Sequence, residues 1–445
     1  MGNKACDKMR IGNKEIPYFL QYEITYACQA HCSFCYNPTR KESTPPMELV
    51  WKIVESIKNS KIPHVQLIGG EVTLIPELPN IIKSLSESVG VTVVTNAIKK
   101  IQFPDELLAL FISLHGSKRE VHEGLTTTDG TYERICKNIT AYADEGRDVS
   151  ADVLLSSKNY FDIYNIVEKA YDLGMKRVFI NRFEPGGIGS ESLEALMPTV
   201  EQFREALTQI IRARDELGAR IELGTSIPFC ADSRLITEGF NFNCGAGTWF
   251  GAVDPRGNLR ICNQSRVPIG NVLEKPVEEL WNANTKYMES FRNLEWVNKP
   301  CSDCPLLNEC LGGCRIDVTC NSERVAQIDY YLRSMKVKPN FEELDALKKV
   351  LYSRQKVKKR IGSFQDMTLN EHIKIVNRRD ASFLLNQEIG VVKIDREVEE
   401  LVRRVYSDQY YVNSLDLDYK DFLYNLGILV PKERRSRKLV EDKVI

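Results

Sequence analysis

The chain has 445 residues, of which 43% are hydrophobic and 27% charged, as in a globular protein with room for two or three domains. Sixty basic residues stand against sixty-one acidic ones, and this balance excludes bulk electrostatic binding to nucleic acid or to an anionic membrane. Residues 1–17 contain no apolar signal region, and no stretch approaches the ~20 apolar residues that span a bilayer. We therefore expect a cytoplasmic protein with no membrane or nucleic-acid partner.

Residues 1–18 are expected as a lead-in, and a strand–helix repeat follows over 19–225. Short β-branched runs predict strands at 20–26, 65–70, 91–96, 110–116, 149–156 and 176–183. Amphipathic segments predict helices at 47–59, 77–88, 131–145, 161–173 and 199–217. Six such units predict an α/β fold, a partial (β/α)6 barrel of the TIM type, in which functional loops follow the C-terminal ends of the strands.

Three cysteines, Cys28, Cys32 and Cys35, follow the first expected strand in a C-x3-C-x2-C array. One disulfide would always leave a thiol over, whereas a metal centre can use all three. Zinc would need a fourth protein ligand, and His31 is awkwardly placed inside the loop. A [4Fe–4S] cluster held by three cysteines leaves one iron open for a small molecule. The array therefore indicates an iron–sulfur site, with a zinc knuckle as the alternative.

This array, with Phe34 before its last cysteine, resembles the cluster loop of the radical S-adenosylmethionine (SAM) enzymes. The tripeptide Gly69-Gly70-Glu71 after the second strand resembles the family's motif for the methionine amino group, and Ser113 resembles a position that contacts the SAM ribose. An ordinary turn and a local serine cap are the alternatives. The resemblance implies that a reduced cluster cleaves SAM to methionine and a 5′-deoxyadenosyl radical, which takes a hydrogen atom from an unactivated carbon.

Four other residues of this half attract attention without a firm role. His115 and His122 are expected as solvated or core histidines. Arg182, at the end of the sixth strand, is expected either to meet a carboxylate or to form a structural salt bridge. Cys136 shares an apolar helical stripe and is expected as a buried core thiol. No catalytic side chain is assigned.

Eight more cysteines lie between residues 230 and 320, and seven of them follow the order C-x12-G-x4-C, C-x2-C-x5-C-x3-C, C. A zinc ribbon does not explain this order, which resembles the SPASM extension of one branch of radical SAM enzymes, expected here over 226–330. By resemblance the extension binds two auxiliary [4Fe–4S] clusters, three clusters in all. The first would be held by Cys244, Cys262 and Cys314, and the second by Cys301, Cys304, Cys310 and Cys320.

Cys230 is the natural fourth ligand for the first auxiliary cluster, although it lies farther from Cys244 than the upstream ligand does in well-defined members. If Cys230 does not ligate, that cluster keeps an open iron for a substrate thiolate. Net two-electron oxidations are typical of this branch, because a low-potential cluster can take the second electron. Asn263 stands where sulfatase-maturing enzymes have an aspartate base, which disfavours that activity.

The last part of the chain changes pattern. A basic helical linker is expected over 331–363 and a small α+β domain over 364–445, which resembles the winged-helix-like domain that binds leader peptides of ribosomally made natural products. A cap on the SPASM region is the alternative. The expected strands are 372–379, 381–386 and 390–395, and the expected helices are 396–407 and 418–430.

These features together predict a radical SAM/SPASM enzyme that oxidatively modifies, and cross-links, a ribosomally made precursor peptide. Its partners would be that peptide and a one-electron reductant such as flavodoxin or ferredoxin. Two alternatives stay open: oxidation of a small molecule, such as a haem precursor or a sugar, and a non-catalytic zinc-binding scaffold.

Overall fold

The computed structural model describes residues 16–41, 44–240, 243–283, 285–292, 294, 297–316, 329, 331–332, 337–356, 367–369, 373–378, 381–386, 390–394, 396–407 and 429–431. The chain forms two compact units, one over Ile11–Tyr352 and one that includes Ser353–Ile445. Within the described ranges, no helix has the length and apolar character needed to cross a membrane.

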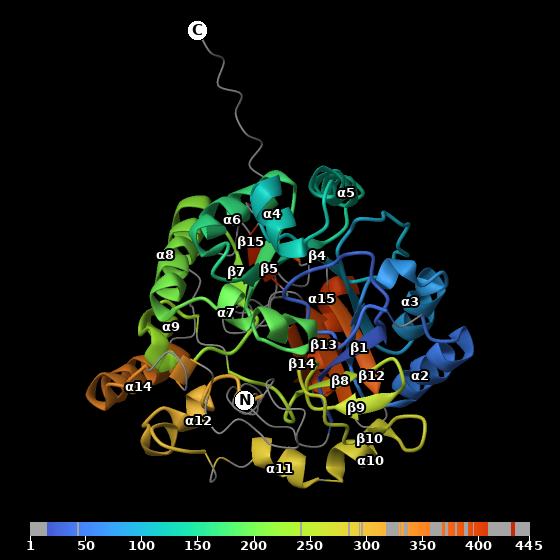
Figure 1. Ribbon diagram of the computed structural model, residues 1–445. Coiled ribbons are helices and arrows are strands. Elements are labelled where there is room, and N and C mark those ends of the chain that lie inside the picture. The colour runs from blue at the N-terminus through green and yellow to red at the C-terminus, as the bar shows by residue number, and fades with distance from the viewer. Residues whose placement is uncertain are drawn as a thin grey trace. The chain divides into compact units, whose positions relative to one another are not determined.

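The first unit is built on a ten-stranded sheet, as far as the chain is described (Figure 1). Strands β1 to β7 lie side by side in chain order and run parallel. The six strands expected from the sequence are confirmed with only their ends shifted, and the short β7 is an addition. Their bounds are β1 Phe19–Thr25, β2 His64–Gly69, β3 Gly90–Thr95, β4 Ala109–Ser113, β5 Val149–Leu155, β6 Arg177–Arg182 and β7 Ile221–Leu223.

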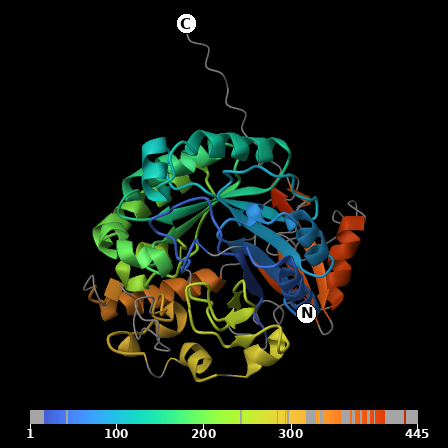
Figure 2. The same ribbon diagram turned by 45° about the vertical axis from the view of Figure 1, so that its right-hand side comes forward.

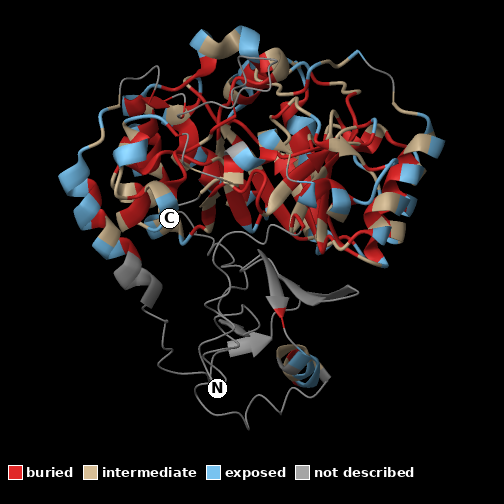
Figure 3. Ribbon diagram, turned by 90° about the horizontal axis from the view of Figure 1, so that it is seen from below, coloured by how far each residue is buried: buried red, intermediate tan, exposed pale blue. Residues whose placement is uncertain are grey.

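Helices cover the outer face of these strands (Figure 2). In α2, the residues Val50, Ile53, Val54 and Ile57 are buried at the spacing that puts them on one face. Each such side chain contributes roughly 1.5–3 kcal/mol to stability when it is removed from water. The bounds are α2 Met47–Asn59, α3 Leu78–Ser86, α4 Arg119–Thr126, α5 Tyr132–Asp144, α6 Ile163–Asp172, α7 Leu193–Leu196 and α8 Val200–Leu217. Figure 3 shows buried residues along the strands and exposed ones on the outer helix surfaces.

The cysteine-rich segment extends the same sheet beyond β1. Strand β8 (Phe250–Val253) pairs in parallel with β1, and β9 (Asn258–Arg260) and β10 (Gly270–Asn271) follow in antiparallel order. A buried ion pair between Glu23 of β1 and Arg260 of β9 joins the two segments, and the Tyr26 hydroxyl donates to Glu23 at 2.9 Å. The barrel and the cysteine-rich segment therefore share one sheet.

Short helices and one long helix complete the first unit. The long helix α14 (Phe341–Lys356) was expected as part of a solvated linker, but its Leu344, Leu347 and Leu351 are buried against Phe229 and Leu306. The helix therefore belongs in part to the apolar core around Cys304 and Cys310. The short helices are α9 Arg234–Thr237, α10 Val277–Asn282, α11 Lys286–Arg292 and α12 Leu307–Cys310.

The second unit contains an antiparallel sheet and a helix. Strands β12 (Ile373–Arg378), β13 (Ala381–Asn386) and β14 (Gly390–Ile394) form a meander, followed by helix α15 (Arg396–Ser407). These four elements confirm the sequence expectation, and the winged-helix likeness stays a prediction. Strand β15 (Leu429–Pro431) pairs with β11 (Met367–Leu369), so the expected helix 418–430 is wrong at its end; residues 418–428 lie outside the described ranges.

Candidate functional site

The loop after β1 brings Cys28, Cys32 and Cys35 together. Burial, helped by Glu71 and Cys35, raises the pKa of the Cys28 thiol to about 11, and burial with Cys35 and Cys28 raises the pKa of Cys32. The Ala30 N–H donates to Cys28 Sγ at 3.4 Å. Neighbouring buried thiols do not ionise together without a compensating positive charge, which a bound cluster would supply. The donor set therefore fits the expected three-cysteine cluster.

A pair of buried histidines packs next to this loop. The ring of Phe34 contacts His115 edge-on with centroids 4.8 Å apart, and His115 stacks on His122 at 5.7 Å. Backbone N–H groups donate to both Nδ1 atoms, from Leu154 to His115 and from His115 to His122, each at 3.1 Å. Burial lowers the pKa of His115 and brings that of His122 to about 4. Both are neutral core histidines at physiological pH, one of the two expected alternatives.

The two glycines of the GGE motif are packed against the start of the cysteine loop. The Gly70 N–H donates to the Thr25 carbonyl at 2.6 Å, and the Glu71 N–H donates to the Ala27 carbonyl at 2.8 Å. A Cβ atom at Gly70 would overlap with the carbonyl of Ala27, and Gly69 has a φ of +152°. The backbone of the cysteine loop thus occupies the space beside both glycines, where a side chain would clash.

The Glu71 carboxylate is buried and oriented by four donors. Its Oε1 accepts from Thr73 N (3.0 Å), Thr73 Oγ1 (2.7 Å) and Thr95 Oγ1 (2.6 Å), and its Oε2 accepts from Asn96 N at 2.8 Å. Oε2 accepts only one hydrogen bond from the described contacts, against three at Oε1, so it keeps a lone-pair position for a further donor. Asn96, which sequence reasoning missed, also donates through Nδ2 to Cys28 Sγ at 3.8 Å. An ammonium group beside the cluster loop could therefore donate a hydrogen bond to Glu71 Oε2.

Ser113, at the end of β4, has a carboxylate beside it that sequence reasoning missed. The β4–β5 register pairs Ser113 with Asp152, and Asn181 of β6 donates to Asp152 Oδ1 at 2.6 Å. Burial raises the pKa of Asp152 to about 6. The only sequence signal was one acidic residue inside a mostly apolar strand. Polar groups from three neighbouring strands thus meet at one level of the sheet.

The first auxiliary group, Cys244, Cys262 and Cys314, is brought together as the resemblance implies. Burial, with Cys244 as neighbour, raises the pKa of Cys262 to about 12, and burial with Glu184 and Cys244 raises the pKa of Cys314. The Gln264 N–H donates to Cys262 Sγ at 3.4 Å. These three thiols form one site.

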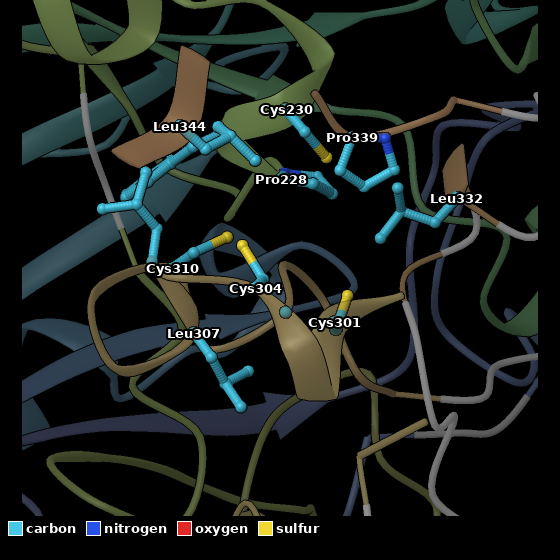
Figure 4. Close-up of a pocket in the computed structure, with 12 residues that line it drawn as sticks. Pro228, Cys230, Cys301, Cys304, Leu307, Cys310, Leu332, Pro339 and Leu344 are labelled. Atoms are coloured by element: carbon cyan, nitrogen blue, oxygen red, sulfur yellow. The ribbon is translucent and has the colours of Figure 1, made fainter. Parts of the chain in front are cut away.

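The second auxiliary group differs from the expectation. Cys230 was expected beside Cys244, Cys262 and Cys314, but it lines a pocket with Cys301, Cys304 and Cys310 (Figure 4). The physical reason is that the turn after β7 packs against α12 and α14. Cys320 lies outside the described residues.

Two remaining expectations concern single residues. The salt-bridge alternative is confirmed for Arg182, which is buried between Glu184 and Asp329, the latter at 2.9 Å. Asp329 also accepts from the Cys314 N–H at 2.7 Å, so the pair positions the first auxiliary group at the end of β6. Cys136, expected as a buried core thiol, is half-buried and packs against the core.

In the described part of the chain, no three His, Cys, Asp or Glu side chains come close enough to hold a single metal ion. A zinc ion draws its thiolates to about 2.3 Å from one point. A four-iron cluster binds each thiolate through a different iron atom.

Known proteins resemble the chain in both cysteine-rich regions. Residues 22–182 match the family model described as the radical SAM superfamily, and residues 244–305 match that of an iron–sulfur cluster-binding domain named SPASM. The subtilosin biosynthesis protein AlbA of Bacillus subtilis is 25% identical over 71% of this chain and 71% of its own length. A PqqA peptide cyclase of Streptomyces rochei is 23% identical over 67% of this chain and 84% of its own length.

A solved structure has the same fold. Streptococcus suis SuiB, bound to the precursor peptide SuiA, superposes with a TM-score of 0.56 over 69% of this chain and 74% of that chain. The sequences are 16% identical, so the likeness concerns the fold alone. It confirms the partial α/β barrel predicted from the strand–helix repeat.

Proposed function

Because the chain belongs to the radical SAM superfamily and carries a SPASM cluster-binding domain, we propose that it oxidatively cross-links a ribosomally made precursor peptide. The observation that carries the proposal is that both domains occur in one chain whose relatives include a PqqA peptide cyclase and a bacteriocin biosynthesis protein. Each similarity covers two thirds or more of both proteins. The reaction would remove two hydrogen atoms from the peptide for each bond that it makes.

The cofactors, when bound, supply electron transfer and a 5′-deoxyadenosyl radical. The protein's contribution is to bind and orient. Cys28, Cys32 and Cys35 would hold the SAM-binding cluster, and Glu71 would accept a hydrogen bond from the methionine ammonium group at its remaining Oε2 position. Ser113, at the end of β4, would contact the ribose of SAM. The rigid backbone contacts between the GGE motif and the cysteine loop keep these groups in register.

The second unit would bind the leader part of the peptide. Among the described strands of its three-stranded sheet, β12 and β14 lie at the edges, since β13 lies between them. An extended leader peptide can add to such an edge through main-chain hydrogen bonds, and tethering raises the effective concentration of the core peptide. A flavodoxin or a ferredoxin would serve as the one-electron reductant.

The direct test is anaerobic co-expression of the full chain with the short reading frames that flank its gene, followed by intact-mass analysis. A decrease in peptide mass equal to two hydrogen atoms would support the proposal, provided that the decrease is absent when Cys28, Cys32 and Cys35 are replaced by alanine. Unchanged peptides, from an enzyme that still cleaves SAM, would contradict it and favour a small-molecule substrate.

A truncation separates leader recognition from catalysis. The chain is truncated after Lys356. An earlier end would remove part of α14, whose leucines are buried beside Cys304 and Cys310. The truncated chain is expected to cleave SAM at the rate of the full chain and to lose modification of the peptide. Retained peptide modification would contradict the proposed role of the second unit.

A further inference from the structure

The turn after β7 carries a cysteine into the middle of the cysteine-rich segment. Residues Phe229–Ala231 form a single 3-10 turn, with Cys230 at its centre. Cys230 packs against two apolar clusters at once, one of which contains Cys310 and the other Cys301. Cys304 packs against the same cluster as Cys310. The turn therefore lies between the segment that contains Cys301 and the segment that contains Cys310.

Backbone groups tie this turn directly to Cys310. The N–H groups of Phe229, the residue before Cys230, and of Gly312 and Gly313 lie close to the Cys310 sulfur, and the Gly313 N–H donates to the Cys310 carbonyl at 3.2 Å. Leu311, Gly312 and Gly313 have φ values of 56°, 78° and 76°, which curl the chain around the sulfur. Such curled runs of N–H groups bind anions and occur around iron–sulfur sites. The Cys310 thiol is therefore surrounded by donors suited to a cluster-bound thiolate.

The four thiols share one pocket. Cys230, Cys301, Cys304 and Cys310 line it together with apolar side chains, and Figure 4 shows Cys230 opposite the other three.

We infer that Cys230, together with Cys301, Cys304 and Cys310, supplies the four thiolate ligands of the second auxiliary cluster. This assignment departs from the one implied by resemblance, in which Cys320 completes that cluster and Cys230 completes the first. A cluster with four thiolates has no open iron, so its role is electron transfer and not substrate binding. The inference rests on the cofactor content of the proposed function and is independent of its peptide substrate.

The test compares single cysteine variants of the full-length, anaerobically reconstituted protein. In every variant, Cys28, Cys32 and Cys35 are also replaced by alanine, so that only the auxiliary clusters contribute iron and EPR signals. Cys304→Ala defines the signal of the second cluster, Cys262→Ala that of the first, and Cys136→Ala is the control. We expect Cys230→Ala to lose about four iron atoms per chain and to remove the same signal as Cys304→Ala.

Two additional variants keep the test decisive if the alanine variant folds poorly. Cys230→Ser, which offers an oxygen ligand, is expected to retain iron but to shift the signal that Cys304→Ala removes. Cys320→Ala is expected to leave that signal in place. The inference is overturned if Cys230→Ala or Cys230→Ser affects the signal assigned by Cys262→Ala, or affects neither signal. These readouts need no peptide, so they stand apart from any failure of the proposed substrate.

Discussion

Replacing Glu71 by glutamine tests whether the buried carboxylate recognises the SAM ammonium group. The amide oxygen can still accept from Thr73 and Thr95 at the Oε1 position, but the amide NH2 then faces the Asn96 N–H. A hydrogen bond to a charged group is worth about 1.5–3 kcal/mol, and an unsatisfied buried donor costs about 1–3 kcal/mol. We expect SAM affinity to fall about 10- to 150-fold through loss of the ammonium contact alone.

The assay is SAM binding to the reconstituted enzyme by equilibrium dialysis, together with iron content and melting temperature. Thr95→Val is the matched control, because it removes a donor from Oε1 and leaves Oε2 untouched. This control is expected to lower stability by about 1–3 kcal/mol and to change SAM affinity less than about threefold. A Glu71→Gln enzyme with full iron content and unchanged SAM affinity would refute the role given to Oε2.

Three further substitutions test the surroundings of the site. Gly70→Ala should lower iron content because its Cβ would overlap with the cysteine loop, whereas Gly124→Ala, with open space around it, should be neutral or stabilising by up to about 1 kcal/mol; equal iron loss in both would contradict the packing argument. The Asp152 pKa of about 6, against an ordinary 3.8, means that the folded protein binds this proton more tightly, so stability falls as pH rises from about 4 to about 6. Asp152→Asn should therefore be more stable than wild type at pH 7, by up to about 3 kcal/mol in unfolding free energy. At pH 4 the variant and the wild type should melt at the same temperature. If they melt alike at both pH values, burial does not raise this pKa. Arg260→Met should cost about 3–5 kcal/mol because Glu23 stays buried without its cation, and adding Glu23→Gln should restore part of the loss in thermal unfolding.

The strand–helix repeat was predictable because each element carries its own period. Helix α2 begins and ends at the predicted residues, since its apolar face is continuous from Met47 to Asn59. Helix α4 was missed, because its eight residues include a glycine and only two aliphatic side chains, Val121 and Leu125. The pairing of β8 with β1 was also missed, since nothing in either segment specifies a partner more than 200 residues away.

The cysteines were predictable as ligand candidates, but their grouping was only partly so. Spacing along the chain associates Cys301, Cys304 and Cys310 because they share one short segment. The partner of Cys230 depends instead on where the turn after β7 packs, which is decided by apolar contacts with α12 and α14. Asn96 and Asp152 escaped notice for a similar reason, since their importance lies in neighbours on adjacent strands.

Two buried ion pairs explain how the first auxiliary group is held against the barrel. Arg260 pairs with Glu23 of β1 and donates to the Ser265 carbonyl at 2.7 Å, so it fixes the loop that contains Cys262. Arg182 at the end of β6 pairs with Asp329, which in turn binds the Cys314 N–H. Buried ion pairs add little net stability compared with apolar residues, but a misplaced partner leaves a buried charge uncompensated. Each pair therefore makes a shift of Cys262 or Cys314 relative to the neighbouring strand unfavourable, as the proposed electron transfer between clusters would require.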